Sequence, residues 1–365
     1  MIDNQNKSFF EELELRRNLV DEYILQPRFT SRFRPDDISS AVTAYVRYGG
    51  KRLRPAILML SCGAVGGDEN IAIPAAAAVE IFHTRTLVHD DIIDRDSIRR
   101  GSPTLHILYA DRTEKGESGF QLEHDLARHY GISVAILSGD VQHGWGICMM
   151  SELSTKNGID ANLTLELINQ LDTNVLNTLV EGEVLDIQYS FKNIEDLTPD
   201  LIEDMLWKKT GALLEFCGQA GAIIGVGKSD HPLVRAMAKF AAKCGTAFQL
   251  QDDILGIVGN QKTLGKPIGS DLREGKRTLV LYYAYRNCNT VERKKLLSVL
   301  GNDHANEADV KECIGLLREK NGISTVKERS QRLIEQALVH LNMLPASRYK
   351  VLLAQWADFM INRDF

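Results

Sequence analysis

Strand signals, repeats and linkers are absent from this 365-residue sequence. No run of alternating apolar and polar residues indicates a β-strand, and no internal repeat of roughly 20 to 50 residues is evident. No Pro- or Ser-rich linker divides the chain. Aromatic residues are few, at 7%, whereas Ala, Leu, Ile, Glu and Lys, which favour helices, are abundant. We therefore expect one all-α domain over residues 1–365, a helical bundle around a central cavity.

Three further absences narrow the functional class. The formal net charge of −6 argues against a nucleic-acid partner. The six cysteines show no C-x-x-C spacing and lie in apolar segments, which indicates structural thiols in a reducing cytoplasm. The first twenty residues lack a basic start followed by an apolar core, so we expect no signal peptide. The most apolar later run, 212–226, is too short and polar to span a bilayer, and we expect a soluble protein.

The most informative stretch is 87–100, which reads LVHDDIIDRDSIRR. No Gly or Pro interrupts residues 75–100, which predicts one long helix. Asp90 and Asp94 then lie about 40° apart on one helical face, with Asp91 beside them. The surrounding residues are apolar, and buried carboxylates are costly unless they are paired or metal-bound. Magnesium accepts one or two carboxylates and completes its shell with water and substrate phosphate. The stretch predicts a magnesium–diphosphate site; a solvated acidic patch is the alternative.

Further charged clusters support that prediction. Asp252 and Asp253 form a second acidic pair in an apolar run, and we expect the two pairs to face each other across the bundle. The turn GGKRLRP at 49–55 places basic residues at the start of a helix, a position that favours anions. Other basic residues lie near the Gly-rich loop 257–275 or on a separate helix: Lys266, Arg273, Lys276 and Arg277, and Lys208 and Lys209. Each alone is a common surface charge, but together they outline a cavity.

Helical periodicity and breakers place the remaining elements. We expect helices at 8–25, 55–64, 75–100, 132–151, 163–189, 198–226, 232–257, 275–287, 290–300, 307–343 with a break near 322, and 346–363. A further helix is expected to start after Pro35, with Asp36 or Asp37 as its N-cap. The polar stretch 110–130 is expected to be a surface insertion with a short helix.

Five motifs, in this order, resemble the trans-isoprenyl diphosphate synthases of the polyprenyl synthetase family. They are GGKRLRP at 49–55, HTRTLVHDDIIDRDSIRRGSPT at 83–104, KT at 209–210, FQLQDD at 248–253 and GKPIGSDLREGK at 265–276. The resemblance implies the isoprenoid synthase fold, a homodimer, and short-chain activity of the geranylgeranyl or farnesyl diphosphate synthase type.

The same resemblance implies roles for individual residues. Metal-binding residues are Asp90, Asp91, Asp94, Asp252 and Asp253, with Asp91 in a supporting role and three Mg²⁺ ions per active site. Isopentenyl diphosphate is held by Lys51, Arg54, His83 and Arg100. The allylic substrate is contacted by Arg99, Lys209, Thr210, Gln249, Lys266 and Lys276, of which Arg99, Lys209 and Lys266 serve catalysis. The family's second acidic motif usually ends in a third aspartate, and Gly256 stands there.

The implied reaction joins an allylic diphosphate head-to-tail (1'-4) with isopentenyl diphosphate after magnesium-assisted ionisation. Product length should depend on the helix below Asp90, where Thr86 lets a chain pass and Phe82 forms a floor. Arg85 is expected to point away from the apolar tunnel, toward a carboxylate or a subunit interface. We expect a C20 product, with farnesyl (C15) or a longer chain as the alternative. A class I terpene cyclase and a non-catalytic partner subunit are the remaining alternatives.

Overall fold

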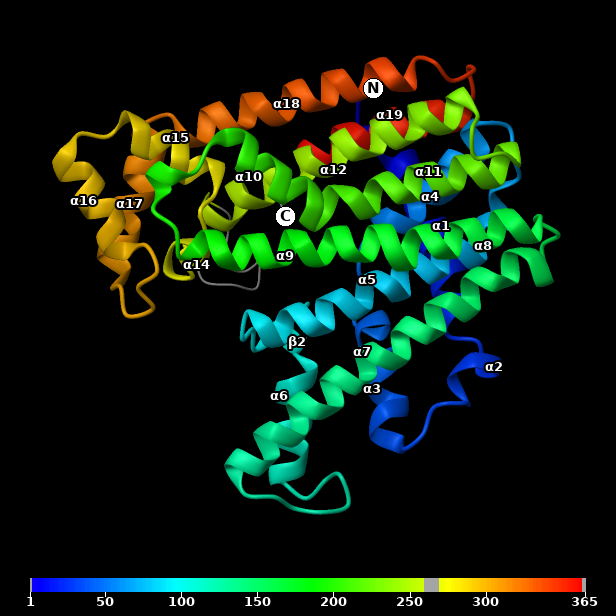
Figure 1. Ribbon diagram of the computed structural model, residues 1–365, viewed down its shortest axis with the longest axis horizontal. Coiled ribbons are helices and arrows are strands. Elements are labelled where there is room, and N and C mark those ends of the chain that lie inside the picture. Colours follow the sequence, from blue (N-terminus) through cyan, green and yellow to red (C-terminus); the bar gives the residue numbers. More distant parts are fainter. Residues whose placement is uncertain (1, 259–268, 363–365) are drawn as a thin grey trace. The chain divides into compact units, whose positions relative to one another are not determined.

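The computed structural model describes residues 2–258 and 269–362, and this part of the chain is almost entirely helical (Figure 1). The all-α expectation is confirmed. The chain divides into two compact units, Met1–Ile168 with Ile223–Ser229, and Asn169–Ala222 with Asp230–Phe365. The single domain stays a prediction, and each unit is described by itself.

The first unit is built on a helix, α5 (Ile73–Ile93), whose N-terminal half is buried on every side. Its elements are α1 (Ile2–Ile24), α2 (Pro27–Thr30), α3 (Asp36–Arg47), α4 (Leu53–Ala64), η1 (Glu69–Ala72), α5 (Ile73–Ile93), β1 (Ile98–Arg99), β2 (Ser102–Pro103), α6 (Leu105–Glu114), α7 (His124–Thr155) and α8 (Ala161–Asn169). The alanines at 75–78 are all fully buried, as are Val79 and Ile81. A helix that is apolar all round is stable only inside a core, and α5 packs against α4 and α7.

The second unit carries the remaining helices. They are η2 (Gln170–Val175), α9 (Leu176–Ser190), η3 (Ile194–Asp196), α10 (Pro199–Leu206), η4 (Trp207–Gly211), α11 (Ala212–Val226), α12 (Pro232–Val258), α14 (Ser270–Arg273), α15 (Leu279–Asn287), α16 (Thr290–Val299), α17 (Glu307–Glu319), α18 (Gly322–Leu341) and α19 (Arg348–Ile361). The long helix α12 packs against α18 and α19 (Figure 1). Most predicted helices overlap the observed ones, but several bounds differ: α7 begins at His124 and not at residue 132, and α15 begins at Leu279 and not at residue 275. Two π-helical segments, η2 and η4, interrupt the helices expected at 163–189 and 198–226, and periodicity does not reveal them.

The prediction that one helix runs through Arg100 is wrong. Helix α5 ends at Ile93 in a Schellman motif, in which Arg95 N–H bonds the carbonyl of Ile92 and Asp96 N–H bonds that of Asp91. Arg95 takes the left-handed conformation that such a motif needs, with φ of 57°. Because Gly is the usual residue at this position, no local sequence signal marks the end of the helix.

A short β-hairpin follows, which the sequence did not predict. Strand β1 pairs with β2 in antiparallel register, with Arg99 opposite Ser102. Arg100 and Gly101 form the two-residue turn, and both have positive φ (55° and 76°), as a type I′ turn requires. The hairpin, not a helix, therefore positions Arg99 and Arg100.

The expected insertion at 110–130 spans the end of α6, residues 115–123 and the start of α7. Cys148 is exposed and the other five cysteines are buried.

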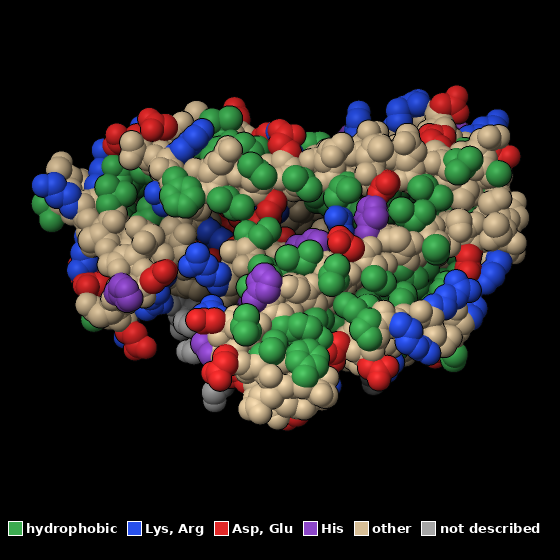
Figure 2. Space-filling view, turned by 60° about the horizontal axis from the view of Figure 1, so that its bottom comes forward, with side chains coloured by type: hydrophobic (Ala, Val, Ile, Leu, Met, Phe, Trp, Pro, Cys, Tyr) green, Lys and Arg blue, Asp and Glu red, His purple; other side chains and the backbone are tan. Residues whose placement is uncertain are grey.

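Among the described residues one helical stretch, Glu69–Ile93, has the length and hydropathy of a membrane span, but 67% of its apolar window is buried, as in a core helix. On the face drawn in Figure 2, acidic and basic side chains lie interspersed among hydrophobic ones.

Candidate functional site

In the first unit the acidic end of α5 contains one fully buried carboxylate. Asp91 is 0% exposed and accepts hydrogen bonds from the hydroxyl of Tyr45 and from Arg99, whose Nε lies 2.8 Å from Oδ1. Asp90 and Asp94 are only half-buried. Asp91 thus holds Arg99, while the carboxylates one turn apart, Asp90 and Asp94, are the more accessible pair.

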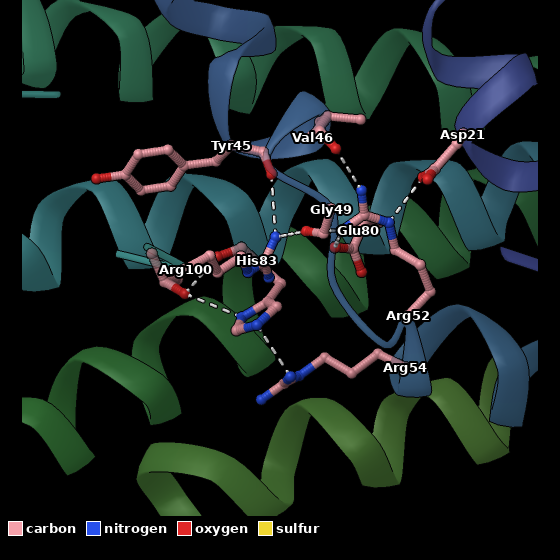
Figure 3. A network of polar contacts seen from close by, with 10 residues as sticks. Asp21, Tyr45, Val46, Gly49, Arg52, Arg54, Glu80, His83 and Arg100 are labelled. Carbon is pink, nitrogen blue, oxygen red and sulfur yellow. Dashed lines mark hydrogen bonds and ion pairs between the residues drawn. The ribbon is translucent and has the colours of Figure 1, made fainter. Parts of the chain in front are cut away.

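His83 lies one helical turn below Thr86 and two below Asp90, among several arginines (Figure 3). Arg54 Nη1 is 3.0 Å from His83 Nε2, and a guanidinium only donates, so Nε2 accepts and the ring proton lies on Nδ1. Burial and the nearby Arg54 and Arg100 hold the pKa of His83 well below its ordinary value. His83 is therefore a neutral acceptor that orients the Arg54 side chain.

The Gly-Gly turn before α4 is fixed by a buried arginine (Figure 3). Arg52, 3% exposed, bonds Asp21 (2.7 Å), Glu80 (2.8 Å) and the carbonyl of Val46 (2.8 Å). Burial raises the pKa of Glu80, although Arg52 opposes that shift. Paired in this way, Arg52 is a structural group that fixes the turn through the carbonyls of Val46 and Gly49.

Arg100 reaches the same turn from the hairpin. Its Nη1 donates to the carbonyl of Tyr45 at 3.0 Å and to that of Gly49. A Cβ on Gly50 would lie 2.8 Å from the Arg100 guanidinium, so only glycine leaves room for it. The hairpin and the turn thus bring Arg100 to the cluster of Arg54 and His83.

The proposed chain-length residues lie on α5. Phe82 is buried, and the Arg85 guanidinium lies 5.9 Å from the centre of its ring, within range of a cation–π contact. Thr86 donates to the carbonyl of His83 at 2.8 Å. The orientation of Arg85 toward a carboxylate or a subunit interface stays a prediction.

In the second unit a lysine is held between two acids. Lys209 Nζ lies 2.6 Å from Asp186 and 2.9 Å from Glu183, both on α9. Burial favours the neutral amine, but Asp186 and Glu183 outweigh it and raise the pKa of Lys209. A Cβ on Gly182 would lie 2.4 Å from the backbone nitrogen of Lys209, so α9 and the π-helical turn η4 approach closely. Lys209 is a fixed, permanent cation.

A chain of polar contacts links Thr210 with the second acidic pair. Thr210 donates to Gln249 Oε1 at 2.9 Å, and Gln249 Nε2 donates to Asp253 Oδ1 at 3.3 Å. Asp253 is 7% exposed, and its Oδ2 has no hydrogen-bond partner among the described residues. Burial, and next the nearby Asp271, raise the pKa of Asp253 well above its ordinary value. A buried carboxylate in such a setting gains from a cation.

The carboxylates of the two acidic pairs are suited to a magnesium ion that takes some of its ligands from the substrate. Among the described residues, no group of three or more Asp, Glu, His or Cys forms a metal site by itself. Magnesium commonly takes one or two protein carboxylates and obtains its other ligands from water and substrate phosphate. The pairs Asp90 with Asp94 and Asp252 with Asp253 supply this chemistry.

The remaining predicted residues are placed as follows. Lys51 is exposed in the Gly-Gly turn, and Lys276 Nζ lies 2.8 Å from Glu274. Lys266 lies outside the described residues. The metal, substrate and catalytic roles assigned to the residues above stay predictions.

Sequence reasoning missed several groups that organise the site: Tyr45, Glu80, Glu183, Asp186 and Asp271. An acid inside the Ala-rich segment of α5 was a usable signal for Glu80. Nothing local in the sequence marks Tyr45, whose partners lie 46 and 60 residues away.

Residues 35–317 match the model of the polyprenyl synthetase family. The chain belongs to this family. It is 34% identical over 299 residues to the geranylgeranyl diphosphate synthase of Saccharolobus solfataricus, covering 82% of this chain and 81% of the relative. The geranylfarnesyl diphosphate synthase of Aeropyrum pernix is 32% identical, with 94% and 99% covered. The crystal structure of geranylgeranyl pyrophosphate synthetase from Pyrococcus horikoshii matches with a TM-score of 0.83 and 30% identity, covering 98% and 99%.

This membership confirms the resemblance drawn from the five motifs, all of which lie within the matched residues. The polyprenyl synthetase family consists of prenyltransferases, and this chain is one of them.

Proposed function

We propose that this prenyltransferase condenses an allylic diphosphate with isopentenyl diphosphate and releases geranylgeranyl diphosphate (C20). The observation that carries the proposal is the arginine cluster around a neutral His83, which can bind an anion directly through cationic side chains and without carboxylate-bound metal. A terpene cyclase has no need of a second diphosphate site. Relatives named as geranylgeranyl and geranylfarnesyl diphosphate synthases favour C20 or a similar length.

Different cationic side chains would bind the two diphosphate substrates. Arg54, Arg100 and Lys51 would hold isopentenyl diphosphate, with His83 fixing the direction of Arg54. Arg99, locked to Asp91, would contact the allylic diphosphate. Preorganised cations of this kind stabilise developing negative charge without reorganising at the moment of reaction.

Three magnesium ions per active site, held by Asp90, Asp94, Asp252 and Asp253, would supply further charge neutralisation for the leaving diphosphate. Lys209 stays protonated because Glu183 and Asp186 raise its pKa, so it can neutralise the same leaving group. Thr210 and Gln249 orient Asp253 through hydrogen bonds. We assign no side-chain general base, because the departing diphosphate can accept the proton.

The decisive experiment supplies the purified chain with Mg²⁺, labelled isopentenyl diphosphate and farnesyl diphosphate, and separates the products. We expect label in a C20 diphosphate. A chain that ignores isopentenyl diphosphate would be a cyclase or a non-catalytic subunit. A chain that makes nothing longer than C15 would overturn the product length alone.

A homodimer in the cytoplasm is the proposed state. Helix α9 and the residue that follows it expose an apolar stripe at helical spacing: Val180 (52%), Val184 (45%), Ile187 (40%) and, after the helix end, Phe191 (85%). Contiguous exposed apolar surface of this kind is typical of a protein interface. Sedimentation of the wild type and of Val184→Glu tests it, with a dimer expected only for the former.

A further inference from the structure

Tyr45 is linked to both arginines of the hairpin through its two oxygen atoms, to Arg100 directly and to Arg99 through Asp91. The hydroxyl donates to Asp91, which holds Arg99, and the backbone carbonyl accepts from Arg100 at 3.0 Å. The hydroxyl oxygen also accepts from the N–H of Leu105, the first residue of α6, at 3.2 Å. One fully buried residue on α3 is therefore bonded to the segments before, within and after the hairpin.

The side-chain contact is suited to holding Asp91 in one orientation. Tyr45 and Asp91 are both 0% exposed. The two carboxylate oxygens of Asp91 accept from different donors, Oδ2 from Tyr45 and Oδ1 from Arg99. A carboxylate only accepts hydrogen bonds, so the phenol of Tyr45 is the donor in this contact. Hydrogen bonds to a charged acceptor are stronger than neutral ones.

The contact of Arg100 with the backbone of Tyr45 satisfies a carbonyl near the C-terminal end of α3. The last four carbonyls of a helix have no partner within it, and arginine side chains from elsewhere can satisfy them. Near the end of α3, Arg100 bonds the carbonyl of Tyr45 and Arg52 bonds that of Val46. Arg100 is thus anchored by backbone atoms that a side-chain substitution at Tyr45 leaves in place.

We propose that Tyr45 is a positioning residue that sets Arg99 through Asp91 and Arg100 through its carbonyl, so that the two adjacent arginines serve different diphosphates. This proposal rests on the proposed function for the identity of the two ligands. The two anchors are chemically distinct, and only the first depends on the phenol.

The test compares Tyr45→Phe with Tyr109→Phe. Tyr109 lies in the same core cluster, is 1% exposed, and donates to the carbonyl of Asp37 at 2.8 Å, with no contact to Asp91 or Arg99 in the described contacts. In Tyr45→Phe we expect KM for dimethylallyl diphosphate to rise about tenfold, the loss of one hydrogen bond to a charged group, and KM for isopentenyl diphosphate to stay within about twofold. In Tyr109→Phe both KM values stay within about twofold.

A second measurement does not require activity. Phenylglyoxal labels accessible arginines, and mass spectrometry reports the rate at each site. We expect Arg99 to label several-fold faster in Tyr45→Phe than in the wild type, with Arg100 unchanged, and neither rate to change in Tyr109→Phe. In an Asp91→Asn background, Tyr45→Phe should have no further effect.

Equal labelling of Arg99 in the two phenylalanine variants would overturn the assignment of Tyr45, whatever the activity. A wild-type chain that incorporates no isopentenyl diphosphate, but in which Arg99 labels faster in Tyr45→Phe, would overturn the proposed function and leave the positioning role standing.

Discussion

A Cβ atom at Gly256 would lie 2.5 Å from Oδ2 of Asp271. The family pattern leads us to expect a third aspartate at residue 256. The carboxylate of Asp271, at the start of α14, lies where the side chain of such an aspartate would begin. Asp271 also contributes to the raised pKa of the buried Asp253. The departure from the family pattern therefore coincides with a carboxylate supplied from another part of the chain.

Gly256→Ala should weaken magnesium binding. The new methyl group displaces Asp271, and loss of a group that supports metal ligands typically costs roughly tenfold or more in metal affinity. The Mg²⁺ dependence of activity and Mn²⁺ binding measured by electron paramagnetic resonance check this. Gly315→Ala in α17, where a Cβ meets nothing within 4 Å, is the control and should bind metal like the wild type. Unchanged metal affinity in Gly256→Ala would show that Asp271 plays no part.

Arg52→Met should destabilise the fold by about 3–5 kcal/mol, because it leaves Glu80 buried without its cationic partner. Arg17→Met removes an exposed ion pair with Glu14 and should cost less than about 1 kcal/mol. Urea unfolding of the two variants gives the comparison. Equal losses would mean that the Arg52 network contributes no more than a surface pair.

Acid should weaken the first unit through Glu152. Burial favours the neutral acid, but hydrogen bonds from Arg28 and Tyr23 outweigh it and lower the pKa of Glu152 from 4.5 to about 2. A group whose pKa is depressed in the folded state stabilises above its unfolded pKa and loses that contribution as the pH falls through the folded value. The wild type should exceed Glu152→Gln in stability by about 3 kcal/mol above pH 4.5, with the gap closing near pH 2.

Denaturant titrations at several pH values measure that gap. Glu14→Gln, at a side chain that is 61% exposed, should track the wild type at every pH. A constant difference between wild type and Glu152→Gln across the range would contradict the prediction.

Lys209→Met should reduce kcat by roughly 10²–10³-fold, as expected for the loss of a preorganised cation at a developing anion. Lys209→Arg, which keeps the charge, should recover part of the rate. The neighbouring Lys208 pairs with Glu181 and Asp204, and Lys208→Met should stay within about twofold of the wild type. Steady-state kinetics decides, and similar rates for both methionine variants would remove Lys209 from the mechanism.

Thr86→Phe should shorten the product from C20 to C15. An aromatic ring one turn below Asp90 would block the path that the prenyl chain follows toward Phe82. Chromatography of the products from dimethylallyl and isopentenyl diphosphate checks the length. Ile93→Phe, at an exposed position on the same helix, should leave the distribution unchanged. An unaltered C20 product in Thr86→Phe would place the tunnel elsewhere.

The sequence predicted those parts of the fold and site that depend on local pattern. Helical periodicity and breakers located most helices, and the five motifs identified the family. The end of α5 was missed because Arg95, and not a glycine, takes the left-handed conformation there. The hairpin was missed for the same reason, because its residues were assigned to the longer helix. Arg52 and Arg54 are the same residue type in the same motif, so the sequence does not separate their roles. In the structure Arg52 is buried in ion pairs with Asp21 and Glu80, whereas Arg54 contacts His83. That difference depends on tertiary packing.

The early end of α5 also changes the electrostatics of its last turn. Aligned peptide dipoles give the C-terminus of a helix a partial negative charge of roughly half an electron, concentrated on its final carbonyls. Because α5 stops at Ile93, this charge lies beside Asp90 and Asp94. The backbone therefore reinforces the attraction of these side chains for a divalent cation.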